Sequence, residues 1–413
     1  MAKETLKLVI IGHVDHGKST LIGRLILDTG SFPLGKIKEL KKISRELGKD
    51  TEIAFLLDQL KEEREQSRTI DTTQVFLKTS KRNYVVIDTP GHAEFIKNMI
   101  TGASCAQAAI LIIDINEGMM EQTKRHAYLI SMLGIKKVIV ALNKIDLVNY
   151  DEVKFNALKS EIAAFLSRVN IFPVAIIPIS AKEGVNIYKK DKKIKWYPGP
   201  SLISCLDGLK LNPRVKNMPL RFPVQDLYDK DCAKMIVGRL ESGLLKKGQQ
   251  VVVLPQNKKT KISSINVFGS CGKKAAYTGE NIGLVLDNSS GVKRGDVIVA
   301  QNCAPMPSKS FKGNVFWMSD QPFLLNKKMI LRCATQEVGC IGESIEKKIN
   351  SVTLDIIDKD PKELRFNEAG SVVFKTDVPV VVEDFTFIEA LGRFTIENGQ
   401  EVQGAGIITE KMP

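Results

Sequence analysis

Residues 12–20 read GHVDHGKST and directly follow the apolar run LKLVII at residues 6–11. The pattern GxxxxGK[ST], placed between a predicted strand and a predicted helix, is typical of a phosphate-binding loop, or P-loop. Its glycines let main-chain N–H groups surround phosphates, its lysine supplies positive charge, and the helix N-terminus adds its positive end. The residues predicted to hold the phosphates are Gly12, Val14, Asp15, His16, Gly17, Lys18, Ser19 and Thr20.

The sequence on either side of the loop predicts an α/β domain. Fully apolar runs are typical of strands that are buried on both faces of a parallel sheet, and the segment 152–169 has helical spacing. We therefore expect a doubly wound, mostly parallel sheet with helices on each side. The further runs that we predict as strands are NYVVID (83–88), AAILIID (108–114), KKVIVALN (136–143) and VAIIPIS (174–180).

The character of the chain changes after Leu209. Short β-rich runs then alternate with glycine-bearing turns about every ten residues, which is typical of all-β barrels or sandwiches. A proline-containing break, APMPS at residues 304–308, divides this half in two. The expected architecture is α/β plus all-β, with a P-loop nucleotide-binding domain followed by two β-barrels. The predicted domains are residues 1–210, 211–304 and 305–413.

The choice of base is predicted by Asn143, Lys144 and Asp146, which form the pattern NKxD at the end of a predicted strand. A carboxylate there accepts both the ring N–H and the exocyclic amine of guanine, a pair of donors that adenine lacks. The tripeptide Ser180-Ala181-Lys182 follows the last strand of the α/β half and matches a loop that closes over guanine. These residues predict that the nucleotides are GTP and GDP.

Asp88-Thr89-Pro90-Gly91 ends another predicted strand and suggests how hydrolysis is organised. Asp88 suits an outer-sphere contact to Mg²⁺, and the Gly91 N–H suits the γ-phosphate, whose presence it would sense. His92 is the candidate that orients the attacking water. The predicted magnesium ligands are Ser19, Asp88 and Thr69. Loss of the contact between Thr69 and Mg²⁺ on hydrolysis would release residues 58–71 as a switch.

Composition limits the class of protein and its partners. At 413 residues, with 43 % hydrophobic and 26 % charged residues, the chain has the composition of a soluble, core-forming protein of several domains. Its net charge of +13 favours an acidic partner, although a general coat of lysine would give the same value. The seven cysteines are scattered, without CxxC or Cys/His clusters, which argues against zinc and disulfides. No signal peptide or transmembrane run is evident, so we expect a cytoplasmic protein without membrane partners.

Together the motifs resemble those of the translation-factor class of GTPases, over essentially the whole chain. GHVDHGKST, DTPGH and HAEFIKNMITGAS are close to signatures of that class. Two relatives within it are similar: elongation factor 1-alpha, and the GTPase subunit of the two-subunit ATP sulfurylase (sulfate adenylyltransferase subunit 1). EREQ, VFWMSDQP and the ending GAGII look more like the sulfurylase subunit. HAEFIKNMITGAS and LGRF look more like the elongation factor.

Each resemblance implies a different role and a different partner. The sulfurylase subunit, which we favour from these motifs, would couple GTP hydrolysis to adenylyl sulfate synthesis by a separate catalytic sulfate adenylyltransferase subunit. The alternative is an elongation factor that carries aminoacyl-tRNA to the ribosome. In both, Lys18 and His92 would serve hydrolysis.

One position departs from both relatives, which carry Gly-Ile where this chain has Ser67-Arg68. In the family that isoleucine, with the valine corresponding to Val14, forms an apolar gate around the catalytic histidine, which an arginine does not reproduce. Either Arg68 points to solvent or pairs with an acidic neighbour, or it reaches the γ-phosphate as an arginine finger supplied in cis.

Overall fold

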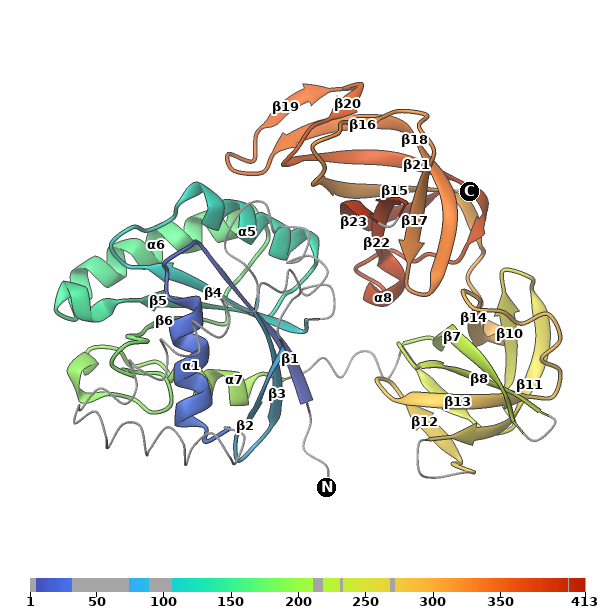
Figure 1. The fold of residues 1–413 in the computed structure, drawn as a ribbon, viewed down its shortest axis with the longest axis horizontal. Helices are drawn as coiled ribbons and strands as arrows, with labels where there is room; N and C mark the ends of the chain where they lie inside the picture. The colour runs from blue at the N-terminus through green and yellow to red at the C-terminus, as the bar shows by residue number, and fades with distance from the viewer. Residues whose placement is uncertain are drawn as a thin grey trace. The chain divides into compact units, whose positions relative to one another are not determined.

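The computed structural model describes residues 5–31, 74–88, 106–210, 218–230, 233–267, 272–399 and 401–412. The chain divides into two compact units (Figure 1). The first comprises residues 1–209 with 351–354, and the second comprises residues 210–350 with 355–413.

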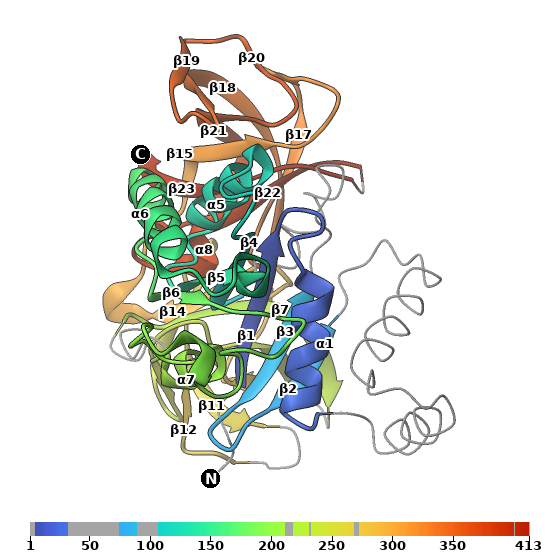
Figure 2. The same ribbon diagram turned by 90° about the vertical axis from the view of Figure 1, so that its left-hand side faces the viewer.

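A six-stranded sheet forms the centre of the first unit within the described residues, in the order β2-β3-β1-β4-β5-β6. Five strands run parallel, and the edge strand β2 pairs antiparallel with β3. Strands β4 and β5 are buried throughout because helices cover both faces; Figure 2 shows α1 on one face and α5 and α6 on the other. The elements are β1 (Thr5–Gly12), α1 (Lys18–Asp28), β2 (Gln74–Lys78), β3 (Asn83–Asp88), β4 (Ala108–Asp114), α5 (Glu121–Met132), β5 (Val138–Asn143), η2 (Ile145–Val148), α6 (Glu152–Arg168), β6 (Ala175–Pro178), η3 (Lys192–Ile194) and α7 (Leu202–Gly208).

The strands predicted from apolar runs are confirmed, and so is the helix predicted at residues 152–169. Helix α6 begins where the Asp151 carboxylate accepts hydrogen bonds from the main-chain N–H groups of Val153 and Lys154. The sequence did not predict β2. This short edge strand buries only Leu77 well, so it lacks the apolar run that marks the others.

Strands of the second unit form a closed barrel in the order β10-β11-β13-β8-β7-β14, with β9 and β12 pairing separately. Alternation explains its core: along β11, Lys259 and Lys261 are exposed whereas Thr260 and Ile262 are buried. The strands of this barrel are β7 (Arg221–Lys230), β8 (Ala233–Arg239), β9 (Leu244–Lys246), β10 (Gln250–Leu254), β11 (Lys258–Asn266), β12 (Ala275–Tyr277), β13 (Asn281–Leu286) and β14 (Val297–Ala300), followed by η5 (Gln301–Cys303).

A second barrel follows in the same unit. Its strands lie in the order β17-β22-β23-β15-β21-β18-β19, and pairing of β17 with β18 closes the ring. Phe311, Phe374 and Phe394 form its centre, with ring centroids 5.3 to 5.5 Å apart. Its elements are β15 (Ser308–Trp317), β16 (Phe323–Leu324), β17 (Met329–Cys333), β18 (Gln336–Asn350), β19 (Ile356–Lys359), β20 (Glu363–Leu364), β21 (Glu368–Val380), α8 (Glu389–Gly392), β22 (Arg393–Asn398) and β23 (Glu401–Met412).

The two barrels are joined by a buried ion pair. Nε of Arg221 lies 2.9 Å and its second terminal nitrogen 2.6 Å from Oε1 of Glu383, with both side chains less than 5 % exposed. The guanidinium also donates to the carbonyl oxygens of Leu220 and Cys303, and Nζ of Lys411 lies 3.4 Å from the other carboxylate oxygen. Apolar side chains of both barrels pack beside the pair: Val252, Leu254, Val297 and Val299 against Val381, Ile388 and Leu391.

The expected architecture of a P-loop domain followed by two β-barrels is therefore confirmed, while the predicted domain limits stay a prediction. No helix among the described residues is long and apolar enough to cross a membrane.

Candidate functional site

The carboxyl ends of the parallel strands bring most of the predicted site residues to one edge of the sheet. The P-loop follows β1, and Asp88, Asp114 and Asn143 are the last residues of β3, β4 and β5. In open α/β sheets this edge is where ligands bind. Ser19 and Thr20 lie in the first turn of α1, and Ser180, Ala181 and Lys182 follow β6.

The P-loop has the backbone that its glycines predict. Gly17 has φ +93°, and Asp15 has φ +62°. A Cβ atom at Gly12 would lie only 2.5 Å from the carbonyl oxygen of Ile112 in the neighbouring strand. Glycine is therefore required at position 12 for close packing and at position 17 for a left-handed conformation.

Lys18 lies across this loop. Its Nζ donates to the carbonyl oxygens of Gly12 at 2.8 Å and His13 at 2.7 Å. Burial lowers the pKa of Lys18 to about 8, against the opposing attraction of the Asp88 and Asp15 carboxylates. A desolvated ammonium group held by two carbonyls is well placed to exchange them for phosphate oxygens.

Asn143 connects the P-loop to the predicted guanine loop. Its Nδ2 donates to the carbonyl oxygen of His16 at 2.9 Å, and its Oδ1 accepts from the main-chain N–H of Ala181 at 2.9 Å. The side chain is only 3 % exposed. The predicted contact of Asn143 with the base stays a prediction. In the structure its side-chain amide connects the P-loop to the loop that begins at Ser180.

Asp146 lies in η2, the turn of 3₁₀-helix that follows β5. Its Oδ1 is buried and has no hydrogen-bond partner among the described residues. A buried carboxylate oxygen without a donor is costly unless a ligand supplies one. This arrangement fits the predicted acceptor for the N–H groups of guanine.

Lys144 is held by a residue that the sequence analysis did not single out. Its Nζ lies 2.6 Å from Oδ2 of Asp114, whose side chain is only 4 % exposed. Lys144 itself has φ +64°, an uncommon conformation for a lysine. The contact arises because β4, which ends at Asp114, pairs with β5, which ends at Asn143.

Two histidines of the P-loop, His13 and His16, lie close to a third, His126. His16 is fully buried, with Nδ1 3.3 Å from the Ile112 carbonyl oxygen and Nε2 3.1 Å from a Glu117 carboxylate oxygen. Its ring centroid lies 5.3 Å from that of His13. Complete burial, aided by the charge of Lys18, lowers the pKa of His126 to about 3, so this ring is neutral at physiological pH. The predicted contact of His16 with phosphate stays a prediction.

Several predicted residues lie outside the described part of the chain: Arg68, Thr69, Gly91 and His92. Their predicted roles in hydrolysis, metal binding and γ-phosphate sensing stay predictions. Among the residues that are described, no group of three or more His, Cys, Asp or Glu could hold a metal ion. A magnesium site here would depend on a hydroxyl, a carboxylate and the nucleotide itself.

Comparison with protein families agrees with this geometry. Residues 3–240 match the family described as the elongation factor Tu GTP-binding domain. Residues 234–299 match elongation factor Tu domain 2, and residues 310–409 match the family described as GTP-eEF1A C-terminal domain-like. The chain belongs to the elongation factor family of GTPases.

Relatives within the elongation factor family are similar over their whole length. Elongation factor 1-alpha of Methanothermobacter thermautotrophicus is 37 % identical over 100 % of this chain and 98 % of its own. Elongation factor 1-alpha of Thermococcus celer is 37 % identical over 99 % and 98 %. Among solved structures, sup35 complexed with GDP is 23 % identical, over 100 % of this chain and 95 % of that one, with a TM-score of 0.48.

The sequence motifs favoured the sulfurylase subunit over elongation factor 1-alpha, and these comparisons reverse that preference. They favour the elongation-factor alternative and give no support to the sulfate adenylyltransferase subunit. The predicted GTP-binding domain is confirmed. Binding of Mg²⁺ stays a prediction.

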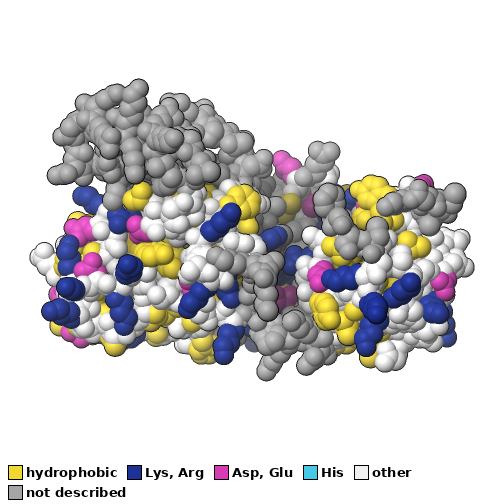
Figure 3. All heavy atoms as spheres, turned by 90° about the horizontal axis from the view of Figure 1, so that it is seen from below, with side chains coloured by type: hydrophobic (Ala, Val, Ile, Leu, Met, Phe, Trp, Pro, Cys, Tyr) yellow, Lys and Arg dark blue, Asp and Glu magenta, His cyan; other side chains and the backbone are white. Residues whose placement is uncertain are grey.

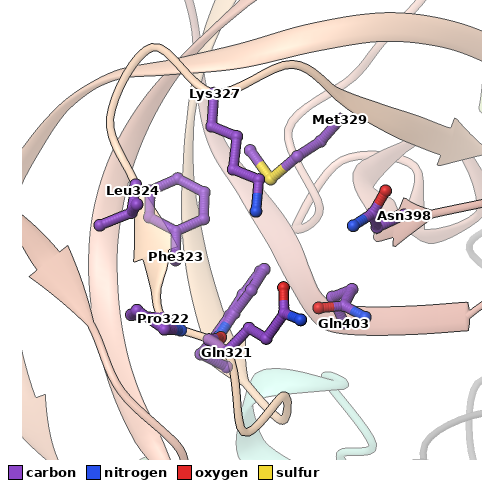
Figure 4. Close-up of a pocket in the computed structure, with 9 residues that line it drawn as sticks. Gln321, Pro322, Phe323, Leu324, Lys327, Met329, Asn398 and Gln403 are labelled. Atoms are coloured by element: carbon purple, nitrogen blue, oxygen red, sulfur yellow. The ribbon is translucent and has the colours of Figure 1, made fainter.

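Of the motifs that resembled the sulfurylase subunit, EREQ at residues 63–66 lies outside the described residues, whereas VFWMSDQP and GAGII have a packing role in the second barrel. Trp317 is 2 % exposed, packs against Phe323 at 5.2 Å, and donates from Nε1 to the Gln321 carbonyl oxygen. In GAGII, Cβ atoms at Gly404 and Gly406 would lie 2.8 Å from the Trp317 ring and 2.7 Å from the Phe394 ring. Both motifs thus accommodate rings of the barrel and carry no signature of a partner. A small pocket beside Trp317 is lined by Gln321, Pro322, Phe323, Leu324, Lys327, Met329, Asn398 and Gln403 (Figure 4).

Proposed function

We propose that this protein is a GTP-driven translation factor that carries aminoacyl-tRNA to the ribosome, acting in the cytoplasm. The observation that carries the proposal is similarity to elongation factor 1-alpha over the full length of both chains, all three domains included. The net charge of +13 also suits an RNA partner.

In this proposal the edge of the sheet selects and holds GTP. Main-chain N–H groups of residues 12–20 and the ammonium group of Lys18 bind the phosphates. The unpartnered carboxylate oxygen of Asp146 accepts from guanine, and residues 180–182 close over the base. Asn143 keeps the phosphate and base loops in register through its two hydrogen bonds.

Magnesium would be held by Ser19 and Asp88, with Thr69 completing the shell in the GTP state. The residues fit this ion, because the Asp88 carboxylate lies near enough to attract the Lys18 ammonium group, and Ser19 follows that lysine directly. The ion would neutralise charge on the β- and γ-phosphates.

Hydrolysis is the attack of water on the γ-phosphate, which gives GDP and phosphate. The chain's contribution is mainly position and charge. Lys18 stabilises charge on the phosphates, His92 holds the water, and Gly91 senses the γ-phosphate. Whether Arg68 adds a positive charge in cis is tested by single-turnover hydrolysis in Arg68→Ala, where an unchanged rate would reject that role.

The proposal is tested by binding and by stimulation of hydrolysis. Labelled aminoacyl-tRNA should bind the GTP-loaded protein more tightly than the GDP-loaded protein, with a steep dependence on salt. Ribosomes programmed with a matching codon should accelerate GTP hydrolysis. Acceleration by a catalytic sulfate adenylyltransferase subunit with ATP and sulfate, and none by ribosomes, would overturn the proposal.

A further inference from the structure

Residues 182–195, here called the lysine loop, carry a dense cluster of positive charge within the described part of the GTP-binding unit and have no part in the site described above beyond Lys182. Six lysines of this loop are exposed: Lys182, Lys189, Lys190, Lys192, Lys193 and Lys195. The acidic residues among them are Glu183 and Asp191. Figure 3 shows Lys and Arg side chains more widely spread than Asp and Glu on one face of the molecule.

Both acidic groups of the loop are already engaged. The Glu183 carboxylate pairs with Nζ of Lys193 at 2.7 Å and accepts from the Tyr150 hydroxyl. The Asp191 carboxylate accepts from the main-chain N–H of Lys193 and so caps η3. The two carboxylates offset only two of the six lysine charges, so the loop keeps a net charge of +4.

The remaining lysines are therefore uncompensated. Within the described part of the chain, the side chains of Lys189, Lys192 and Lys195 make no hydrogen bond or ion pair. Some lysines of the barrels are paired, as Lys273 is with Glu280 and Lys312 with Glu346.

The lysine loop is also held firmly in place. The Ser201 hydroxyl donates to the Tyr188 carbonyl oxygen at 3.0 Å, and Nζ of Lys190 donates to the Pro198 carbonyl oxygen at 2.8 Å. The Trp196 ring packs 5.1 Å from that of Phe155, and its Nε1 donates to a main-chain carbonyl oxygen. A main chain that is already ordered loses little conformational entropy when a partner binds.

An aromatic ring distinguishes between the acidic partners that could meet these charges. Tyr188, immediately before Lys189, is 37 % exposed, and its main-chain carbonyl oxygen accepts a hydrogen bond from the Ser201 hydroxyl. An exposed ring beside lysines offers a face for an unpaired base while the lysines contact phosphates. An acidic protein would supply carboxylates and no base to stack.

We propose that the lysine loop is a contact surface for the phosphate backbone of RNA, with Tyr188 stacking on an unpaired base. This deepens the proposed function, on which it rests, by giving the GTP-binding unit an RNA contact of its own. Each lysine that meets a phosphate releases a counterion, and so makes binding more sensitive to salt.

The test uses the full-length protein and a fluorescently labelled RNA hairpin with an unpaired loop, titrated at several salt concentrations. The triple variant Lys189→Gln, Lys192→Gln, Lys195→Gln should reduce the slope of log K against log salt by ~2 and weaken binding about ten-fold or more at low salt. Tyr188→Ala should weaken hairpin binding ~5-fold or more and leave that slope unchanged. The matched control removes three exposed lysines elsewhere in the unit: Lys78→Gln, Lys81→Gln and Lys136→Gln.

Equal losses in both triple variants would overturn the proposal, because net charge alone would then explain binding. Loss of binding to a polyglutamate peptide with hairpin binding retained would also overturn it, in favour of an acidic protein partner. The hairpin carries no amino acid and is measured with GDP bound. Its result therefore stands apart from the GTP-dependent binding of aminoacyl-tRNA that tests the proposed function.

Discussion

Replacement of Asn143 by alanine should damage nucleotide binding more than the loss of one base contact would. The side chain makes two buried hydrogen bonds, to the His16 carbonyl oxygen and from the Ala181 N–H. Alanine leaves both main-chain groups buried without partners. At ~1–3 kcal/mol for each, the cost is about 2–6 kcal/mol. Even the lower figure corresponds to an affinity loss of about 30-fold if it falls on the nucleotide-binding conformation.

The assay is titration of Asn143→Ala with fluorescent GDP, together with thermal unfolding of the nucleotide-free protein. Asn156→Ala is the matched control, because Asn156 is exposed on α6 in the same unit. Asn143→Asp should be at least as damaging as the alanine variant, because its second carboxylate oxygen would face the His16 carbonyl oxygen, acceptor against acceptor, in a buried site. A GDP affinity and an unfolding temperature unchanged in Asn143→Ala would refute the bridging role.

Three further predictions follow from the site and the barrels. Because burial lowers the pKa of Lys18 to about 8, the folded protein loses this proton before the unfolded chain does. The free energy of unfolding should therefore rise with pH from about 8 towards the ordinary lysine value of 10.5, while GDP affinity falls; Lys18→Met should remove both trends in pH-dependent denaturation and titration. Gly12→Ala should abolish GDP binding, since its Cβ would collide with the backbone of Ile112; tight binding of GDP by this variant would contradict the described packing. Glu383→Ala should destabilise the second unit by about 3–5 kcal/mol in urea unfolding, because Arg221 is left buried without its partner. The double variant Arg221→Met, Glu383→Leu should recover most of that loss.

The sequence predicted the parallel sheet and the P-loop because both have strong local signals. Strands buried on two faces read as uninterrupted apolar runs, and a phosphate loop needs glycine and lysine at fixed spacing. The edge strand β2 was missed because only one of its side chains is well buried. Strands were therefore predictable where both of their faces are buried, and not at the exposed edge of the sheet.

The partners of the site side chains were harder to predict. NKxD indicated the base correctly as a pattern, but no spacing shows that Asn143 reaches back to His16, 127 positions away. The link from Lys144 to Asp114 is likewise made only when neighbouring strands align.

Motifs in the second barrel misled the choice of relative for a physical reason. VFWMSDQP and GAGII contain a tryptophan and glycines that fit together in the interior. Residues of this kind indicate how a barrel is packed, which two functionally different relatives can share.

The contact between Arg221 and Glu383 joins positions that are 162 residues apart in the chain. Substitution of either residue alone leaves an unpaired charge in the buried interface, whereas simultaneous replacement of both by apolar residues does not. Single substitutions at either position should therefore be selected against. Where the ion pair is lost during evolution, both residues should be replaced together. An alignment of close homologues should show the two columns changing together, far more often than either changes by itself.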